Sequence, residues 1–142
     1  MTNNEGQGTR GFTGLGIAPG ILEMLVKLGY ETPTPIQEQA IPVAMQGKDM
    51  VGIAQTGTGK TFAFGIPMIQ RLAQIKGRGL VVLPTRELAT QVDESLRKVG
   101  GLSLRTAVLI GGVAMGPQKA ALARDPQIII ATPGRLNDHL QQ

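Results

Sequence analysis

The chain has 142 residues, about the size of one domain, and 42% of them are hydrophobic, so a packed core is expected and wholesale disorder is excluded. Lysine and arginine number 14 against 10 acidic residues, a net charge of +4 that permits nucleic-acid binding without demonstrating it. The chain has no cysteine, no apolar signal segment and no apolar run near the roughly 20 residues that span a bilayer. Disulfide scaffolds and cysteine-based zinc sites are excluded, and we expect a cytoplasmic α/β protein without a membrane partner.

The N-terminal part predicts two helices after a flexible segment. Residues 1–11 are polar and glycine-rich, and we expect them to be flexible. Apolar residues recur at helical spacing over Pro19–Leu28, and Gly29 follows where a glycine cap belongs. Thr34 begins the second helix: it is an N-cap hydroxyl, with proline next and Gln37 three residues later, which is the capping-box pattern.

The remainder of the chain predicts alternating strands and helices. Four short segments dense in Val, Ile and Leu are expected strands: Met50–Ala54, Leu80–Leu83, Leu104–Ile110 and Ile128–Ala131. Helical segments are expected at about Lys60–Ile75, Thr85–Val99, Pro117–Ala123 and from Pro133 onward. This order indicates an α/β fold with a parallel sheet flanked by helices, in which the helices begin at the carboxyl ends of the strands.

A phosphate-binding loop is predicted between the first expected strand and its helix. The residues Ala54-Gln55-Thr56-Gly57-Thr58-Gly59-Lys60-Thr61 match the pattern G-x-x-x-x-G-K-[ST], except that Ala54 replaces the first glycine. Backbone N–H groups from Gln55 to Gly59 would hold phosphate oxygens, Lys60 would contact the β and γ phosphates of ATP, and Thr61 would help to hold Mg²⁺. The alternative is a glycine-rich turn with a solvated lysine.

Together with four other motifs, this loop resembles the DEAD-box ATP-dependent RNA helicase family. Gly29–Gln37 is similar to the family's Q motif and Ala54–Thr61 to its motif I, which begins with alanine. The other matches are Pro84–Ala89 with motif Ia, Gly111-Gly112 with the GG element and Thr132–Arg135 with motif Ib. The resemblance implies an incomplete first RecA-like domain over residues 12–142, with the Q motif in 12–40, the phosphate loop in 54–61 and RNA-facing motifs at 84–89, 111–112 and 132–135.

The Q-motif region is expected to bind the adenine of ATP. The Gln37 amide offers one donor and one acceptor that complement adenine, so Gln37 would favour ATP over GTP. The alternative is that Gln37 only completes the capping box of Thr34; both roles can coexist. Tyr30 is the candidate for stacking on the base, with Phe12, the aromatic upstream of the motif, packed behind it; otherwise these rings belong to the core or surface.

Three later motifs are expected to contact RNA through its sugar-phosphate backbone, without reading bases. Pro84, Thr85 and Arg86 place a capped helix N-terminus beside a guanidinium, and Thr132, Pro133, Gly134 and Arg135 repeat the design. Gly111 and Gly112 would allow close approach of the backbone. Each motif alone is typical of an ordinary strand-to-helix connection. Glu87 is expected to stabilise its helix, and Asp138 and His139 to lie on a solvated face.

The resemblance also implies parts that this sequence does not contain. No Asp-Glu-x-Asp is present, so the family's acidic motif is absent, as is the second RecA-like domain. We therefore expect the isolated chain to lack ATP turnover, although the family couples ATP hydrolysis to RNA duplex unwinding or ribonucleoprotein remodelling. The strand Met50–Ala54 would lose a neighbour and leave an apolar edge, which favours self-association or partial opening. Alternatives are a non-catalytic nucleotide- and RNA-binding fragment and a P-loop ATPase that acts on DNA.

Overall fold

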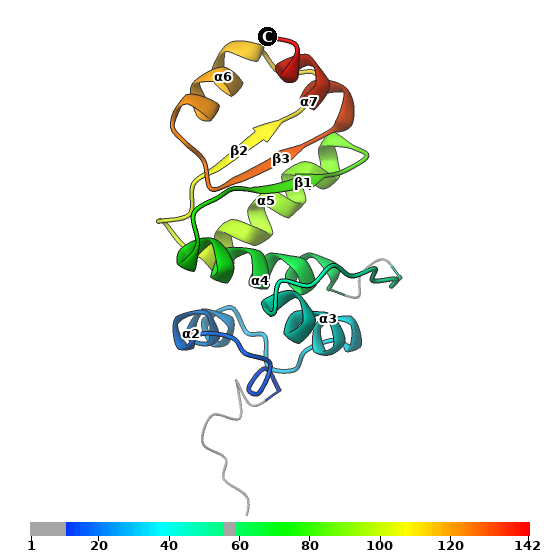
Figure 1. Ribbon diagram of the computed structural model, residues 1–142, viewed down its shortest axis with the longest axis vertical. Coiled ribbons are helices and arrows are strands. Elements are labelled where there is room, and N and C mark those ends of the chain that lie inside the picture. The colour runs from blue at the N-terminus through cyan, green and yellow to red at the C-terminus, as the bar shows by residue number, and fades with distance from the viewer. Residues whose placement is uncertain (1–10, 56–58) are drawn as a thin grey trace, which may run out of the picture.

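The computed structural model describes residues 11–55 and 59–142 as helices around a small parallel sheet (Figure 1). The helices are α2 (Pro19–Lys27), α3 (Pro35–Met45), α4 (Lys60–Gln74), α5 (Arg86–Gly100), α6 (Met115–Ala123) and α7 (Pro133–Leu140). The strands are β1 (Gly79–Val82), β2 (Thr106–Leu109) and β3 (Ile128–Ala131). No helix in this described part is both long and apolar enough to cross a membrane.

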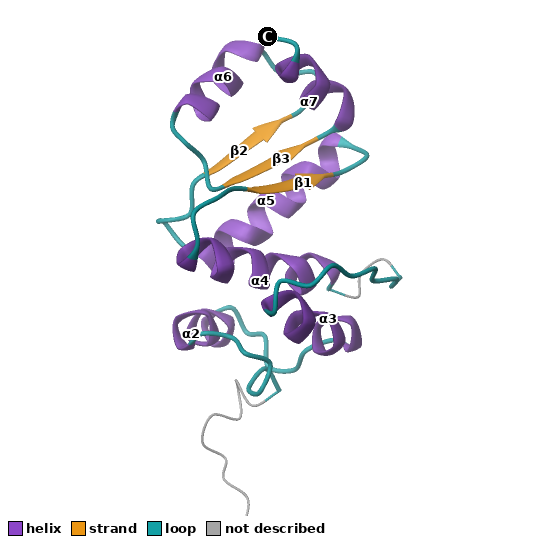
Figure 2. Ribbon diagram, in the orientation of Figure 1, coloured by secondary structure: helices purple, strands orange, loops and turns teal. Residues whose placement is uncertain are grey.

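The sheet is parallel and has the strand order β1-β3-β2 (Figure 2). Val82, Ala131 and Leu109 lie opposite one another in the register, so all three strands end at the same level. The segments that follow them therefore leave the sheet at one edge. The expected fold class, an α/β fold with a parallel sheet flanked by helices, is confirmed.

The central strand β3 shows why helices cover both faces of the sheet. Successive side chains of a strand point to opposite faces. Ile128 and Ile130 are fully buried in a cluster with Val92 and Leu96 of α5. Ala131 and the half-buried Ile129 belong to a second cluster with residues of α6 and α7. A strand buried on both faces requires apolar residues at every position, which the segment Ile128–Ala131 provides.

The N-terminal helices α2 and α3 pack with α4 around a separate cluster (Figure 1). Its largest fully buried side chains are Phe12, Leu25, Ile41 and Ile66. The cap expected at Gly29 is present: this glycine has a φ of 85°, and the Tyr30 N–H donates to the Leu25 carbonyl oxygen at 2.9 Å. This bond closes the last turn of α2 as a left-handed glycine cap does.

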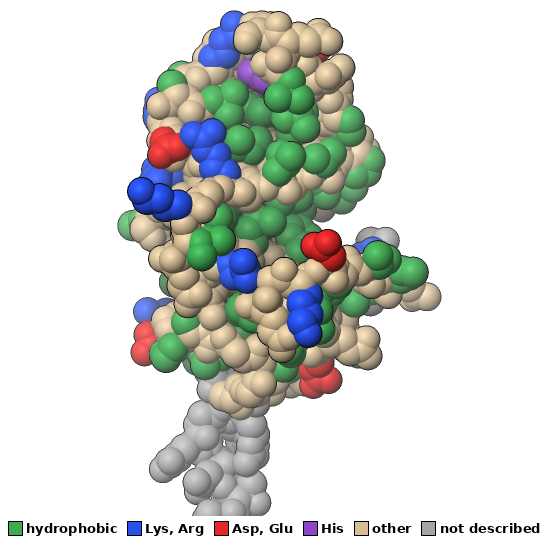
Figure 3. All heavy atoms as spheres, viewed as in Figure 1, with side chains coloured by type: hydrophobic (Ala, Val, Ile, Leu, Met, Phe, Trp, Pro, Cys, Tyr) green, Lys and Arg blue, Asp and Glu red, His purple; other side chains and the backbone are tan. Residues whose placement is uncertain are grey.

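The expected strand at Met50–Ala54 is wrong. The segment forms no strand, and the side chains of Val51 and Ile53 are each 91% exposed. A strand gains its stability from hydrogen bonds to a neighbour, and no described residue pairs with this segment. Leu80 and Val82 on the free edge of β1 are about half exposed, and Figure 3 shows hydrophobic side chains across the middle of this face. The apolar edge of the sheet therefore belongs to β1 and not to the expected strand Met50–Ala54.

Candidate nucleotide and nucleic-acid sites

Helix α3 and the start of α4 are joined by one glutamine side chain. Gln37 completes the capping box: the Thr34 N–H donates to its Oε1 at 2.9 Å, while its own N–H donates to the Thr34 hydroxyl at 3.4 Å. Its Nε2 also donates to the carbonyl oxygen of Gly59 at 3.1 Å. The side chain, 4% exposed, thus fixes the end of the phosphate-loop motif to the first turn of α3.

Gly59 is required at this junction for two independent reasons. Its φ of 84° lies in the left-handed region, which favours glycine. A Cβ atom added at Gly59 would collide with Gln37 Nε2 and approach the Thr34 hydroxyl to 3.1 Å. Only glycine permits the backbone to turn into α4 this close to Gln37.

The bonds of Gln37 bear on both of its predicted roles. Its capping role is present in the structure. An amide group has two N–H donors and two acceptor lone pairs, and the bonds to Thr34 and Gly59 use one of each. One donor and one acceptor remain for a base, although the side chain is almost completely buried. Adenine recognition by Gln37 stays a prediction.

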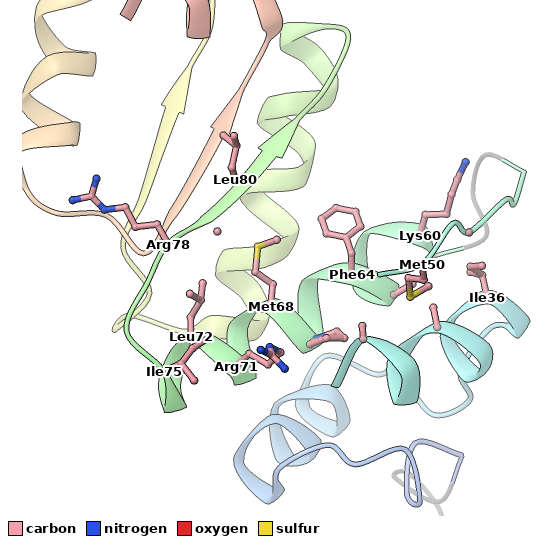
Figure 4. A pocket seen from close by; sticks show the side chains of 16 residues that line it. Ile36, Met50, Lys60, Phe64, Met68, Arg71, Leu72, Ile75, Arg78 and Leu80 are labelled. Atoms are coloured by element: carbon pink, nitrogen blue, oxygen red, sulfur yellow. The ribbon is translucent and has the colours of Figure 1, made fainter. Parts of the chain in front are cut away.

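The described part of the phosphate-loop motif places its charged residue at a helix N-terminus. Lys60 is the first residue of α4, and its exposed side chain extends away from α3 (Figure 4). Thr61 follows, half-buried, and Gln55 is exposed on the other side of the loop. The predicted contacts of Thr56, Gly57 and Thr58 lie outside the described residues. The unpaired N–H groups and positive dipole of a helix start suit an anion beside Lys60.

The two aromatic candidates occupy different environments. Tyr30 is 40% exposed, and its ring meets that of Phe62 edge-on, with centroids 4.9 Å apart at 87°. Phe12 is 1% exposed and lies in the N-terminal cluster with Phe62. Tyr30 therefore has surface available for stacking, whereas Phe12 is enclosed in the core. Their contacts with adenine stay predictions.

The three predicted RNA-facing motifs meet at the carboxyl edge of the sheet. Pro84–Arg86 follows β1, Thr132–Arg135 follows the central strand β3, and Gly111-Gly112 follows β2. Because these strands end in register, the motifs lie on one edge in the order of the strands. The Thr132 N–H donates to the Leu109 carbonyl oxygen at 3.1 Å, which links the second motif to the end of β2.

Motif Ia reaches the glycine pair through its arginine. Thr85 caps α5 by accepting from the Leu88 N–H at 3.2 Å, and the exposed Pro84 precedes it. Arg86 lies so close to Gly112 that a Cβ on this glycine, whose φ is 80°, would collide with Nη1. Its guanidinium pairs with Glu87 at 3.3 Å. A backbone hydrogen bond, and then Arg86, hold the pKa of Glu87 below its usual value, so this residue is charged at neutral pH.

Arg135 is held by the protein rather than displayed on its surface. Its side chain is 16% exposed, donates to the carbonyl oxygen of Val113 at 2.9 Å and pairs with Asp138 at 3.6 Å. Thr132 caps α7 without a side-chain bond, and Pro133 and Gly134 are exposed in its first turn. Arg86 and Arg135 thus flank the glycine pair, one exposed and the other enclosed.

Gln118, the buried glutamine of α6, belongs to none of the sequence motifs. It is 4% exposed and bonds to Arg135 and to His139, the latter at 2.8 Å. His139 is half-buried, so the expected solvated face is wrong for it and correct for the exposed Asp138. The available signal was spacing: Gln118 precedes Ala121 and Leu122 by three and four residues, which places it on their buried helix face.

A cavity of about 630 Å³ lies between α3, α4 and the free edge of β1 (Figure 4). Apolar side chains line most of it, with Lys60 at one end and Arg71 and Arg78 toward the other. Ile36 of the Q motif and Lys60 of the phosphate-loop motif line this cavity, whereas Gln37 and Tyr30 do not. Over residues 11–55 and 59–142 no three acidic or histidine side chains cluster as a metal site.

Comparison with known proteins agrees with these motifs. A family model described as DEAD/DEAH box helicase matches residues 34–142. The chain is 51% identical over 134 residues to the ATP-dependent rRNA helicase RRP3 of Gibberella zeae, covering 92% of this chain and 28% of that protein. Against the RRP3 protein of Pyricularia oryzae the identity is 47% over 145 residues, covering all of this chain and 27% of that protein.

Solved structures show the same relationship. A DEAD box protein from Methanococcus jannaschii superposes with a TM-score of 0.85 at 37% identity, covering 92% of this chain and 37% of that one. The RNA helicase Prp28 of Chaetomium thermophilum, solved with ADP, gives 0.84 at 37% identity, with 93% and 34% covered. The chain spans less than a third of the length of these curated relatives. It belongs to the DEAD/DEAH box helicase family, and its α/β fold is part of a RecA-like domain of that family.

Proposed function

We propose that the chain is the nucleotide- and RNA-binding front part of an ATP-dependent RNA helicase. The observation that carries the proposal is the bond between Gln37 and Gly59, which joins the Q-motif helix to the glycine that begins α4. A residue suited to reading a base and a loop suited to holding phosphates are thereby fixed to each other. The curated relatives are named ATP-dependent rRNA helicases, which supports the same reaction class.

The residues at the start of α4 fit a nucleoside triphosphate. Gly59 has a left-handed backbone conformation, and any Cβ atom at this position would collide with the Gln37 side chain. Lys60 is exposed at the N-terminus of α4. Lys60 would neutralise charge on the β and γ phosphates, and the Thr61 hydroxyl would help to hold Mg²⁺, which supplies further charge neutralisation. Tyr30 and Gln37 would orient the adenine.

The carboxyl edge of the sheet would hold RNA by its sugar-phosphate backbone. Arg86 supplies an exposed guanidinium. A capped helix start comes from Pro84 and Thr85, backbone without side chains from Gly111 and Gly112, and a second helix start from Thr132–Gly134. These groups complement phosphates and sugars and carry no pattern that distinguishes bases. Binding should therefore be independent of RNA sequence and sensitive to salt.

The isolated chain is proposed to bind without turnover. Phosphoryl transfer needs a positioned metal, water and charge, and the sequence lacks Asp-Glu-x-Asp. A steady-state ATPase assay of the chain with RNA checks this, and turnover comparable to that of complete helicases would contradict it. The unwinding or remodelling activity, a partner second domain and a cytoplasmic location are proposed for the protein that contains this chain.

Self-association of the 142-residue chain is a further proposal. Two exposed apolar surfaces support this proposal. One is formed by Val51 and Ile53, and the other is the free edge of β1 on the opposite side of the cavity. Extended apolar segments with open hydrogen-bonding groups pair readily with other chains. Sedimentation velocity at increasing concentration measures it, and a single monomer boundary at all concentrations would contradict it.

The central experiment measures binding of a fluorescent ATP analogue with Mg²⁺ to the wild-type chain and to Lys60→Ala. We expect at least tenfold weaker binding for the variant, because a charge-assisted phosphate contact is lost. Lys98→Ala, which removes an exposed lysine from α5, is the matched control and should bind as the wild type does. Equal affinity of the wild type and Lys60→Ala would overturn the nucleotide assignment.

Competition experiments separate the proposal from its alternatives. Preference for ATP over GTP that is lost in Gln37→Ala supports adenine recognition, whereas an unchanged ratio leaves Gln37 with its capping role alone. Preference for single-stranded RNA over DNA supports the helicase class, and the reverse preference favours a P-loop ATPase that acts on DNA.

A further inference from the structure

Gln118 of α6 links two of the RNA-facing motifs although it belongs to neither. Its Nε2 donates to the carbonyl oxygen of Ile110 at 2.8 Å, at the end of β2. Its Oε1 accepts from Arg135 Nη1 at 3.4 Å and contacts His139 Nε2 at 2.8 Å, both on α7. A glutamine this deeply buried is uncommon, and here its bonds satisfy both ends of its amide.

The chemistry of its partners fixes the orientation of the amide. The Ile110 carbonyl can only accept, so the nitrogen of Gln118 must face β2. The Arg135 guanidinium can only donate, so the oxygen must face α7. His139 must then donate from Nε2, and a neutral His139 carries its proton on that nitrogen. The side-chain amide of Gln118 therefore cannot be flipped without losing its hydrogen bonds to both β2 and α7.

These bonds hold the glycine turn from both ends. Ile110 directly precedes Gly111-Gly112, and Val113 directly follows it. Gln118 ties the Ile110 carbonyl to α7, and Arg135 donates to the Val113 carbonyl at 2.9 Å. A turn of two glycines has little conformational preference of its own. Its position relative to the start of α7 is thus set by contacts that pass through Gln118 and Arg135.

We propose that Gln118 is a positioning residue for RNA binding, which holds the Gly111-Gly112 turn at a fixed place beside Thr132–Gly134 so that both meet one RNA backbone. The inference rests on the proposed RNA-binding function. It also assigns Arg135 a different part from Arg86: its enclosed guanidinium acts through the Val113 carbonyl, and the RNA contacts of this region come from the turn and the first residues of α7.

The test uses the 142-residue chain labelled with ¹⁵N, as wild type, Gln118→Ala, Gln118→Glu and Gln70→Ala. Gln70 is the matched control, because it makes a comparable bridge away from the RNA edge: its Nε2 donates to the Gly16 carbonyl oxygen at 2.8 Å, and the Ala18 N–H donates to its Oε1 at 2.7 Å. The measurements are the amide resonances of the glycine turn, the pKa of His139, and the affinities for a fluorescein-labelled oligouridylate and for a fluorescent ATP analogue.

Gln118→Ala should move the amide resonances of Gly111, Gly112 and Val113 and weaken RNA binding by about five- to tenfold, with ATP affinity unchanged. Gln118→Glu keeps the acceptor toward α7 but loses the donor to Ile110, so RNA binding should weaken similarly while the new carboxylate raises the pKa of His139. Gln70→Ala should leave the turn, His139 and RNA binding unchanged.

Three results would overturn the inference. If the turn resonances of a folded Gln118→Ala match those of the wild type, Gln118 does not position the turn. If the resonances move but RNA affinity stays the same, the position of the turn does not matter for RNA. If Gln70→Ala weakens RNA binding equally, the effect is general destabilisation. Failure of the proposed function is recognised separately, because the wild-type chain itself would then not bind the oligouridylate.

Discussion

Replacing Gly59 by alanine tests whether α3 and the start of α4 act as one unit. An alanine with the observed φ of 84° costs about 1 kcal/mol. Its Cβ would also displace the Gln37 side chain, which weakens the bond to Gly59 and the capping box by about 1 kcal/mol each. The free energy of unfolding should fall by about 3 kcal/mol, which for a chain of this size lowers Tm by roughly 10 °C.

The assay is thermal and urea unfolding followed by circular dichroism, with Gly14→Ala as the control. Gly14 has the same φ of 84° but nothing within 4 Å of an added Cβ, so its replacement should cost only the conformational term of about 1 kcal/mol. In the Gln37→Ala background the collision with Gln37 Nε2 is absent and only the contact with the Thr34 hydroxyl remains, so the cost of Gly59→Ala should fall toward the conformational term of about 1 kcal/mol. Equal losses for Gly59→Ala and Gly14→Ala in the wild-type background would refute the reasoning.

Other predictions concern the RNA edge, the apolar edge and the histidine. Arg86→Ala should lower the salt dependence of RNA binding by about one phosphate without loss of stability. Arg135→Ala removes an enclosed guanidinium and should instead lower the free energy of unfolding by about 1–2 kcal/mol. Equal stability of the two variants would contradict the difference in burial. Replacing Val51 and Ile53 by lysine should shift sedimentation toward monomer, and unchanged association would point to another interface. Burial, and then Arg135 and Lys119, lower the pKa of His139, while Asp138 opposes them. The unfolded chain therefore binds the histidine proton more tightly than the folded chain does. The free energy of unfolding should fall as the pH drops from about 7.5 to 5.5. A His139→Gln variant with the same loss in urea unfolding would assign it to other groups.

Local patterns predicted the elements whose stability is mostly local. The capping box of Thr34 and Gln37 and the glycine cap at Gly29 depend on neighbours within a few residues, and both are present. The apolar run Ile128–Ala131 predicted the central strand with its bounds, because a strand buried on both faces has few alternatives. The similar segment Met50–Ala54 did not form a strand, since pairing needs a neighbour and the composition of one segment cannot supply it.

The contacts that organise the sites join distant parts of the chain and were beyond prediction from local spacing. Gln37 and Gly59 are 22 residues apart, and the sequence showed each motif without the bond between them. Arg135 matched a phosphate-binding pattern, but its enclosure by Val113 depends on how α7 packs against the turn after β2. Gln118 carries no motif, and its role follows only from the side chains that surround it.

The shared level at which the three strands end limits how much of a polymer the carboxyl edge can touch. Neighbouring strands lie about 4.8 Å apart, so the two outer strands of a three-stranded sheet are about 10 Å apart. With roughly 3.4 Å between stacked nucleotides, that width corresponds to about three nucleotides. A footprint of this size displaces few counterions, so a plot of log affinity against log salt for this edge alone should have a slope no steeper than about −2.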